Sequence, residues 1–147
     1  MKYFAYGSNM DVQQMEEREV CFTGRKKAVL EGYALKFNKI ASGKEAKEGE
    51  GKGNVVTDPQ GITEGALYEM TEAGLRKLDG NEKGYDRVKL GVRLDGSKVK
   101  AWVYVAQPDK VREGLRPRGK YLKHYLKGKD LLSSEYYQML EKVETID

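Results

Sequence analysis

Stretches in which apolar and polar residues alternate recur along the chain, and they predict β-strands. They cover residues 2–6, 21–38, 54–56, 62–70, 85–94 and 99–106. Glu31-Gly32 interrupts the longest stretch, and the turn-forming trio Pro59-Gln60-Gly61 separates two others. Asp95-Gly96 lies between the last two stretches and is a strong β-hairpin signal. The pattern therefore predicts five or six strands, most of them antiparallel.

Helical spacing of apolar residues marks shorter segments between and after these strands. Residues 10–17 predict a short helix with Asn9 or Asp11 as its N-cap, and Thr71 caps a second helix that ends near Asp79-Gly80. Residues 119–126 and 133–143 predict two more helices, and the glycine- and charge-rich residues 42–53 predict a mobile surface loop. We therefore expect an α+β fold, a curved sheet or small barrel with scattered helices, in a single domain over residues 1–147.

The composition narrows the classes of protein to which the chain can belong. A single cysteine excludes a disulfide framework and favours a reducing, cytoplasmic location. That residue, Cys21, lies beside Val20 and Phe22 and is expected to be a small buried hydrophobe. The one histidine, His124, is expected at the surface, and without a cluster of His or Cys ligands we expect no metal site. The apolar runs are too short to span a membrane.

Positive charge is concentrated in residues 98–129, which contain ten basic and two acidic residues. Tyr121 and Tyr125 lie among these cations, and such a mixture occurs on nucleic-acid-binding surfaces. A solvated face, or a positive field around a pocket for a small anion, has the same composition. No recognition helix, RNA-binding aromatic pair or zinc-finger spacing accompanies the charge, so a nucleic-acid partner is the weaker interpretation.

Three segments carry candidate chemistry. Tyr6-Gly7-Ser8-Asn9 follows the first strand, where successive backbone N–H groups can bind a carboxylate, although a simple turn with Asn9 as a cap is the alternative. Glu82 lies between a helix and a strand, where partial burial would raise the pKa of its carboxyl group; the alternative is a solvated turn with Glu82 paired to Lys83 or Arg87. Tyr121 near a helix start either donates a hydrogen bond to an anionic ligand or packs with its hydroxyl in water.

The order of these motifs resembles that of the γ-glutamylcyclotransferase family, from the start of the chain to the last helix. The resemblance rests on Tyr6-Gly7-Ser8-Asn9-Met10 after the first strand, then Gly65-Ala66-Leu67-Tyr68-Glu69-Met70, then Leu78-Asp79 with Glu82 three residues on. Pro117 with Tyr121, followed by Glu135-Tyr136, completes it. The Tyr-Gly-Ser-Asn element is fairly specific, and the Leu-Asp-x-x-Glu element adds to it.

The resemblance implies a small mixed β-barrel with flanking helices and a cofactor-independent enzyme. In the implied reaction the α-amine of a γ-glutamyl group attacks its own γ-carbonyl, which leaves 5-oxoproline and releases an amine or amino acid. Glu82 would be the general acid/base. Contacts to a small γ-glutamyl substrate would come from Tyr6, Gly7, Ser8, Asn9, Met10 and Tyr121, with the amides of residues 7–9 around the glutamyl head.

Two positions depart from the family pattern. Lys83 stands where the family usually has a glycine directly after the catalytic glutamate, and Gly84 follows it. Arg118 replaces the serine that commonly follows the proline of the last motif, and it could recruit a more acidic leaving group. A non-catalytic module that binds γ-glutamyl compounds is therefore an alternative to an enzyme. The sequence leaves open which amine or amino acid is released, from glutathione or from another compound. It also leaves open whether the protein is a monomer or a homodimer.

Overall fold

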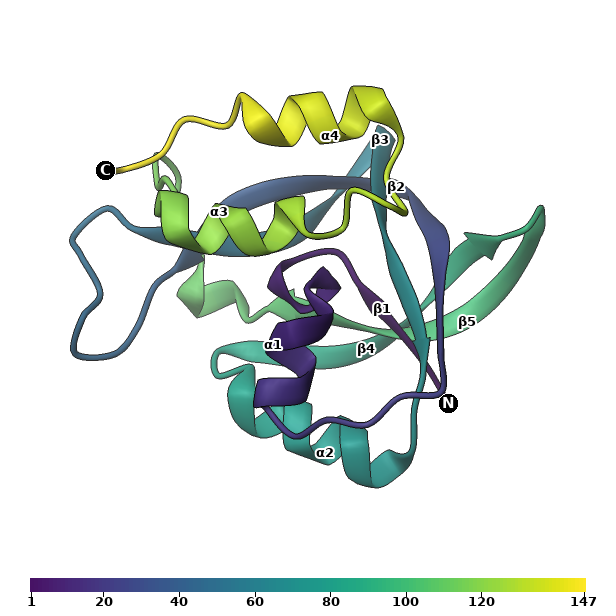
Figure 1. Ribbon diagram of the computed structural model, residues 1–147. Coiled ribbons are helices and arrows are strands. Elements are labelled where there is room, and N and C mark those ends of the chain that lie inside the picture. The colour runs from purple at the N-terminus through teal and green to yellow at the C-terminus, as the bar shows by residue number, and fades with distance from the viewer.

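Five strands close into a barrel in the computed structural model, which describes residues 1–147 (Figure 1). The strands are β1 (Lys2–Ala5), β2 (Gly24–Ile40), β3 (Gly51–Glu69), β4 (Tyr85–Leu94) and β5 (Ser97–Ala106). Their order around the barrel is β1-β3-β2-β4-β5; β1 pairs with β5 in parallel, and every other pair is antiparallel. The predicted α+β fold, a small mixed barrel with flanking helices, is confirmed.

The prediction of two separate strands around Pro59 is wrong, because β3 runs through this position. Glu31 pairs with Ile62 and Tyr33 with Thr57, so residues 58–61 form a bulge opposite Gly32. Proline has no N–H to give to a ladder, and a bulge is one of the few places in a sheet that accepts it. Pairing resumes on both sides of the bulge, which joins the two predicted strands into one.

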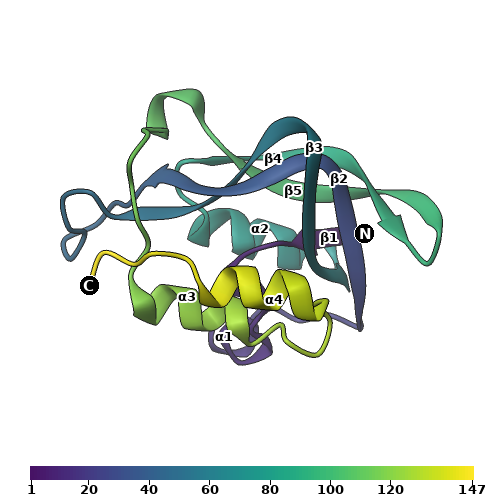
Figure 2. The ribbon, with the colours of Figure 1, turned by 90° about the horizontal axis from the view of Figure 1, so that it is seen from above.

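Helices pack against the outside and one end of the barrel. They are the 3₁₀ helices η1 (Ser8–Met10) and η2 (Pro108–Lys110) and the α-helices α1 (Val12–Glu17), α2 (Glu72–Asn81), α3 (Gly119–Leu126) and α4 (Ser134–Glu141). Figure 2 shows α3 and α4 side by side, with β2 to β5 across the molecule from them. None of these helices has the length and apolar character needed to cross a lipid bilayer.

Side-chain caps account for where several helices begin. The side chains of Asp11, Thr71 and Ser133 accept hydrogen bonds from backbone amides in the first turns of α1, α2 and α4. Of the two caps predicted for the first helix, Asp11 is the one used, because Asn9 is buried within η1. The predicted helix over residues 119–126 is confirmed.

Two apolar clusters form the core. One is formed by residues of the barrel strands, with Phe4 among aliphatic side chains that include Leu30, Val55, Val92 and Val103. The other lies between the barrel and the helices. Cys21 belongs to neither: it precedes β2 in an irregular segment and is exposed, so the expectation of a buried cysteine is wrong.

Candidate active site

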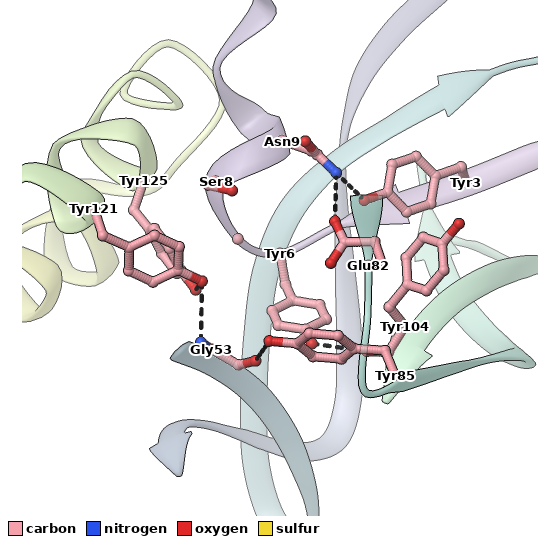
Figure 3. A pocket seen from close by; sticks show the side chains of 11 residues that line it. Tyr3, Tyr6, Ser8, Asn9, Gly53, Glu82, Tyr85, Tyr104, Tyr121 and Tyr125 are labelled. Atoms are coloured by element: carbon pink, nitrogen blue, oxygen red, sulfur yellow. Dashed lines mark hydrogen bonds between the residues drawn. The ribbon is translucent and has the colours of Figure 1, made fainter. Parts of the chain in front are cut away.

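A pocket opens at the end of the barrel where β1 leads into η1 (Figure 3). Its walls come from β1, η1, the starts of β3 and β4, the end of α2, β5 and α3. The lining residues are Tyr3, Tyr6, Gly7, Ser8, Asn9, Gly53, Glu82, Tyr85, Tyr104, Tyr121 and Tyr125. Six tyrosines thus surround a single carboxyl group, which belongs to Glu82.

Glu82 is held by the end of α2. It is the C-cap residue, and its amide donates to the carbonyl of Leu78 at 3.0 Å. Its side chain is 17% exposed and lies 3.1 Å from the Asn9 side-chain amide and 3.6 Å from the Arg18 guanidinium. The carboxyl group faces the pocket beside Tyr3 and Asn9 (Figure 3). It is not paired with Lys83 or Arg87, as the solvated-turn interpretation would require; Arg87 binds Asp79 instead.

Burial raises the pKa of the Glu82 carboxyl group above its ordinary value. The cation of Arg18 and the hydrogen bond from Asn9 oppose this rise, and the more distant Lys39 and Lys52 oppose it further. The partial negative charge at the C-terminal end of α2 acts in the same direction as burial. The result is a carboxyl group that can hold a proton more readily than a solvated glutamate.

The side chain of Asn9 positions Glu82. Its Oδ1 accepts hydrogen bonds from Gln14 at 3.0 Å and Arg18 at 2.9 Å, so its amino group is directed to the other side. There Nδ2 donates to Glu82 at 3.1 Å and to the hydroxyl of Tyr3 at 2.9 Å. Sequence reasoning assigned only the backbone of Asn9 to the site and missed this function of its side chain.

The turn at residues 7–9 forms one wall of the pocket. Met10 N donates to Gly7 O at 3.0 Å as the first hydrogen bond of η1, so the amides before it have no partner within that helix. A Cβ at Gly7 would lie 3.0 Å from the hydroxyl oxygen of Tyr125, which leaves little room for any side chain there. The wall is therefore made of backbone and short side chains.

Gly53 joins the opposite wall to three tyrosines. Its amide donates to the Tyr121 hydroxyl at 3.0 Å, and its carbonyl accepts from the Tyr85 hydroxyl at 2.7 Å (Figure 3). The hydroxyls of Tyr121 and Tyr125 are 2.8 Å apart. A Cβ at Gly53 would overlap the Tyr125 hydroxyl, so any other residue here forces Tyr125 or the strand to shift. Burial raises the pKa of Tyr121 to about 12, which keeps its hydroxyl protonated at neutral pH.

The structure brings most of the residues named from the sequence to this pocket: Tyr6, Gly7, Ser8, Asn9, Glu82 and Tyr121. Met10 is the exception, because its side chain is fully buried, packs near Gly128 and does not line the pocket. The proposed contact between Met10 and substrate therefore has no support in this geometry. The Tyr121 hydroxyl is hydrogen-bonded to protein and not left in water.

Sequence reasoning missed several lining residues. Tyr125 follows Tyr121 by one helical turn, so the i, i+4 spacing could have indicated that both face the pocket. Gly53 belongs to the segment for which the sequence predicts a surface loop. Nothing in the neighbouring residues indicates that this glycine packs tightly against tyrosines. Arg18 touches Glu82 although 64 residues separate them in the chain, which no sequence pattern announced.

The remaining reactive residues lie outside the pocket. His124, expected at the surface, is half-buried, and its Nδ1 lies 2.7 Å from a carboxylate oxygen of Asp11. Lys83 is exposed, and the chain turns at Gly84 with φ +86°, one position later than the family pattern places its glycine. No three His, Cys, Asp or Glu side chains form a group that could hold a metal ion.

Comparison with known proteins is consistent with this geometry. A family model described as "Gamma-glutamyl cyclotransferase, AIG2-like" matches residues 3–125. Comparison with curated protein sequences gives no match.

Three solved structures illustrate the similarity. The chain resembles a structure titled "Gamma-glutamyl cyclotransferase" with 24% identity and a TM-score of 0.85, over 100% of this chain and 89% of that one. An uncharacterized protein from Homo sapiens is 26% identical, with a TM-score of 0.83 over 99% and 89% of the two chains. A yeast γ-glutamyl cyclotransferase described as specific to glutathione is 13% identical, with a TM-score of 0.65 over 95% and 93%. Because the family model spans most of the chain, the protein belongs to the γ-glutamyl cyclotransferase, AIG2-like family.

Proposed function

We propose that the protein is an enzyme that releases 5-oxoproline and a free amine or amino acid from a γ-glutamyl compound. The observation that carries this proposal is the position of Glu82. A largely buried carboxyl group faces the same pocket as the backbone turn at residues 7–9. This arrangement places a proton carrier next to the turn, whose backbone amides would be the hydrogen-bond donors for a glutamyl group. Membership of the γ-glutamyl cyclotransferase family supports the same reaction.

The reaction takes place within one substrate molecule. The α-amino nitrogen attacks the γ-carbonyl carbon, a five-membered ring forms, and the bond from that carbon to the leaving nitrogen breaks. Nucleophile and electrophile are already joined, so holding the reactive conformer supplies much of the acceleration; effective molarities of oriented groups reach about 10⁵–10⁸ M. The close-packed tyrosines and the turn at residues 7–9 would hold that conformer.

Proton transfer is the remaining requirement. The α-ammonium must lose two protons on its way to the lactam nitrogen, and the departing amine takes up two at neutral pH. Glu82 would carry a proton from the attacking nitrogen to the leaving one. A carboxyl group whose pKa is raised by burial suits both steps, because it accepts a proton and holds it until the leaving nitrogen needs it. Backbone amides of the turn and the Tyr121 hydroxyl would stabilise the negative charge that develops on the carbonyl oxygen.

The test is a panel of γ-glutamyl substrates with mass detection of 5-oxoproline. The panel contains a γ-glutamyl dipeptide, glutathione and γ-glutamyl-lysine. Glu82→Gln keeps the size and hydrogen-bonding capacity of the side chain but removes its proton transfer, so kcat should fall by about 10²–10⁴-fold while the substrate still binds. Glu16→Gln, an exposed substitution on α1, is the matched control and should leave kcat unchanged. Full turnover by Glu82→Gln would remove this residue from the mechanism.

Neither alternative function gains a specific observation. The departures that suggested a non-catalytic module lie outside the pocket: Lys83 is exposed, and Arg118 binds Glu50. Ion pairs neutralise part of the basic segment that suggested a nucleic-acid partner: Arg112 binds Glu48, and Arg116 binds Glu144. Detection of 5-oxoproline would end the first alternative, and absence of DNA or RNA binding at low salt would end the second.

A further inference from the structure

A wider groove adjoins the pocket, and we call it the outer groove. It is more open than the pocket and shares Ser8 and Tyr121 with it. The segment between β2 and β3, which projects on the side of the C-terminus in Figure 1, forms one of its walls together with the start of α3. Two carboxylates line it, from Glu45 and Glu50, and five cations: Arg18, Lys44, Lys52, Arg118 and Lys120.

A buried carboxylate organises the cations nearest to Tyr121. The side chain of Glu50 is 5% exposed, and its Oε1 accepts a hydrogen bond from Arg118 Nε at 2.9 Å. Its other oxygen lies 3.9 Å from Lys52 Nζ. Lys52 Nζ in turn lies 4.1 Å from the centre of the Tyr121 ring. Glu50 thus fixes two cations at the boundary between the pocket and the outer groove.

The cations exceed the carboxylates that could neutralise them. Arg118 uses Nε on Glu50 and Nη2 on the Glu45 carbonyl, which leaves the Nη1 donors without a protein partner. Lys44 and Lys120 are exposed and form no ion pair in the structure. A surface that carries unpaired cations and free N–H donors attracts an anion.

The position of the groove relates it to one part of the substrate. Glu82 and the turn at residues 7–9 line the pocket, so a glutamyl group must enter it to react. The leaving group, bonded to the γ-carbon, must then extend past Ser8 and Tyr121, which are the residues common to both spaces. It would emerge beside Lys52 and Arg118.

We infer that the outer groove binds the leaving group and selects leaving groups that carry negative charge, such as an acidic amino acid or a short acidic peptide. This inference rests on the proposed function, because it identifies the substrate class of the same reaction. Arg118 and Lys52 receive the carboxylate nearest to the scissile bond, and Lys44 and Lys120 favour a second one through their longer-range field.

The first test compares three substrates that differ in the charge of the leaving group. γ-Glutamyl-ethylamide has no carboxylate there, γ-glutamyl-glutamine has one, and γ-glutamyl-glutamate has two on almost the same frame. We expect kcat/KM to rise along this series, by at least about tenfold at the step that adds the first carboxylate, which is the effect of one hydrogen bond to a charged group. The rise should shrink in high salt, because screening weakens attraction between exposed charges. A series that is flat or reversed would overturn the inference.

Variants identify the cations that carry the preference. Arg118→Gln should reduce the ratio of kcat/KM between γ-glutamyl-glutamine and γ-glutamyl-ethylamide by about tenfold. In this variant the buried Glu50 carboxylate loses its charged partner, which could disturb folding. The double variant Glu50→Gln/Arg118→Gln removes both charges together, so it tests the same loss without leaving a buried charge unpaired. Arg112→Gln is the matched control, because Arg112 is an exposed cation that pairs with Glu48 and lies outside the groove. This control should show the wild-type ratio of kcat/KM between the two substrates. If the Arg118 variants also keep the wild-type ratio, Arg118 does not carry the preference.

Equilibrium binding separates a failure of this inference from a failure of the proposed function. Calorimetry of Glu82→Gln with the same three compounds measures selection without turnover. If no compound yields 5-oxoproline with the wild type, the proposed reaction is wrong, whereas tighter binding of the acidic compounds still supports an anion-selective groove. Equal affinity for all three compounds would overturn the inference even if the wild type turns every one of them over.

Discussion

The pocket and the outer groove adjoin each other but are built in opposite ways. In the pocket, tyrosine hydroxyls and a single carboxyl group are held by internal partners: Gly53 binds two tyrosines, and Asn9 binds both Glu82 and Tyr3. In the outer groove, charged side chains predominate and several end in solvent, as Lys44 and Lys120 do.

This difference corresponds to two tasks. A reaction within one molecule needs a fixed conformer, which a buried and hydrogen-bonded pocket supplies because its groups need not reorganise during the reaction. Recognition of a leaving group tolerates looser contacts, since exposed charges such as those of Lys44 and Lys120 attract at a distance and individually contribute about 0–1 kcal/mol. Substitutions in the pocket should therefore affect the chemical step, whereas substitutions in the outer groove should affect the choice of leaving group, and the sizes of these effects should differ.

The largest effect is expected where the pocket is most crowded. Gly53→Ala places a Cβ that overlaps the Tyr125 hydroxyl, so Tyr125 or the strand must shift. We expect loss of about 1–3 kcal/mol in the free energy of unfolding and loss of detectable 5-oxoproline formation, measured by urea denaturation and by mass. Gly80→Ala on α2 is the control, because nothing lies within 4 Å of its added Cβ. Equal behaviour of the two variants would show that the pocket is not tightly packed.

A smaller effect is expected from Asn9→Ala, which removes the amide that positions Glu82. The donors on Gln14 and Arg18 lose their acceptor, so the free energy of unfolding should fall by about 1–3 kcal/mol. We expect kcat to fall more than KM rises, since a misplaced acid/base affects the chemical step. Asn81→Ala, at an exposed site on α2, should change neither constant. A pure KM effect would argue that Asn9 serves binding and not catalysis.

Arg18 lines the outer groove and also contacts Glu82 of the pocket, so its replacement sharpens the comparison through a pH profile. Its cation lowers the pKa of Glu82 against the effect of burial, and Arg18→Met removes this opposition. The pKa of Glu82 then rises further, and the acidic limb of kcat should move to higher pH for acidic and neutral substrates alike. Arg76→Met, a solvent-exposed substitution on α2, is the control. An unmoved acidic limb would mean that Glu82 is not the group that titrates there.

The smallest expected effect concerns stability and its dependence on pH. Below the ordinary glutamate pKa of about 4.3, Glu82 is protonated in both folded and unfolded chains and contributes no pH-dependent difference. As pH rises toward the raised native pKa, the unfolded chain releases its proton first, so the wild type loses stability. Glu82→Gln lacks this loss and should gain stability relative to the wild type as pH rises above about 4.3, measured by urea denaturation. Glu16→Gln should show no such trend.

Local sequence features account for much of the fold. Asp95 and Gly96 adopt positive φ values of 50° and 81°, which the hairpin signal at these two residues anticipates. Thr71 caps α2 as its side chain suggests. The continuity of β3 was not foreseen, because Pro59 and Gly61 favour a turn locally, and only the pairing of both flanks with β2 shows that they form a bulge.

The candidate site was only partly visible in the sequence. The element Tyr6-Gly7-Ser8-Asn9 and the carboxyl group of Glu82 could be named from their local context and the family resemblance. The packing of Gly53 against Tyr125 could not, because 72 residues separate the two in the chain. The same holds for the ion pair of Glu50 and Arg118, which are 68 residues apart.

By itself, the sequence determined the local elements, the turn and cap positions and the chemical groups available for proton transfer and anion binding. The tertiary structure alone decided which of these groups meet. Closure of the barrel brings Asn9 within hydrogen-bonding distance of Glu82, 73 residues later in the chain, and sets Lys52 over the ring of Tyr121. Burial, pKa and selectivity depend on such neighbours in space, and strand register and barrel closure supply them where local preference does not.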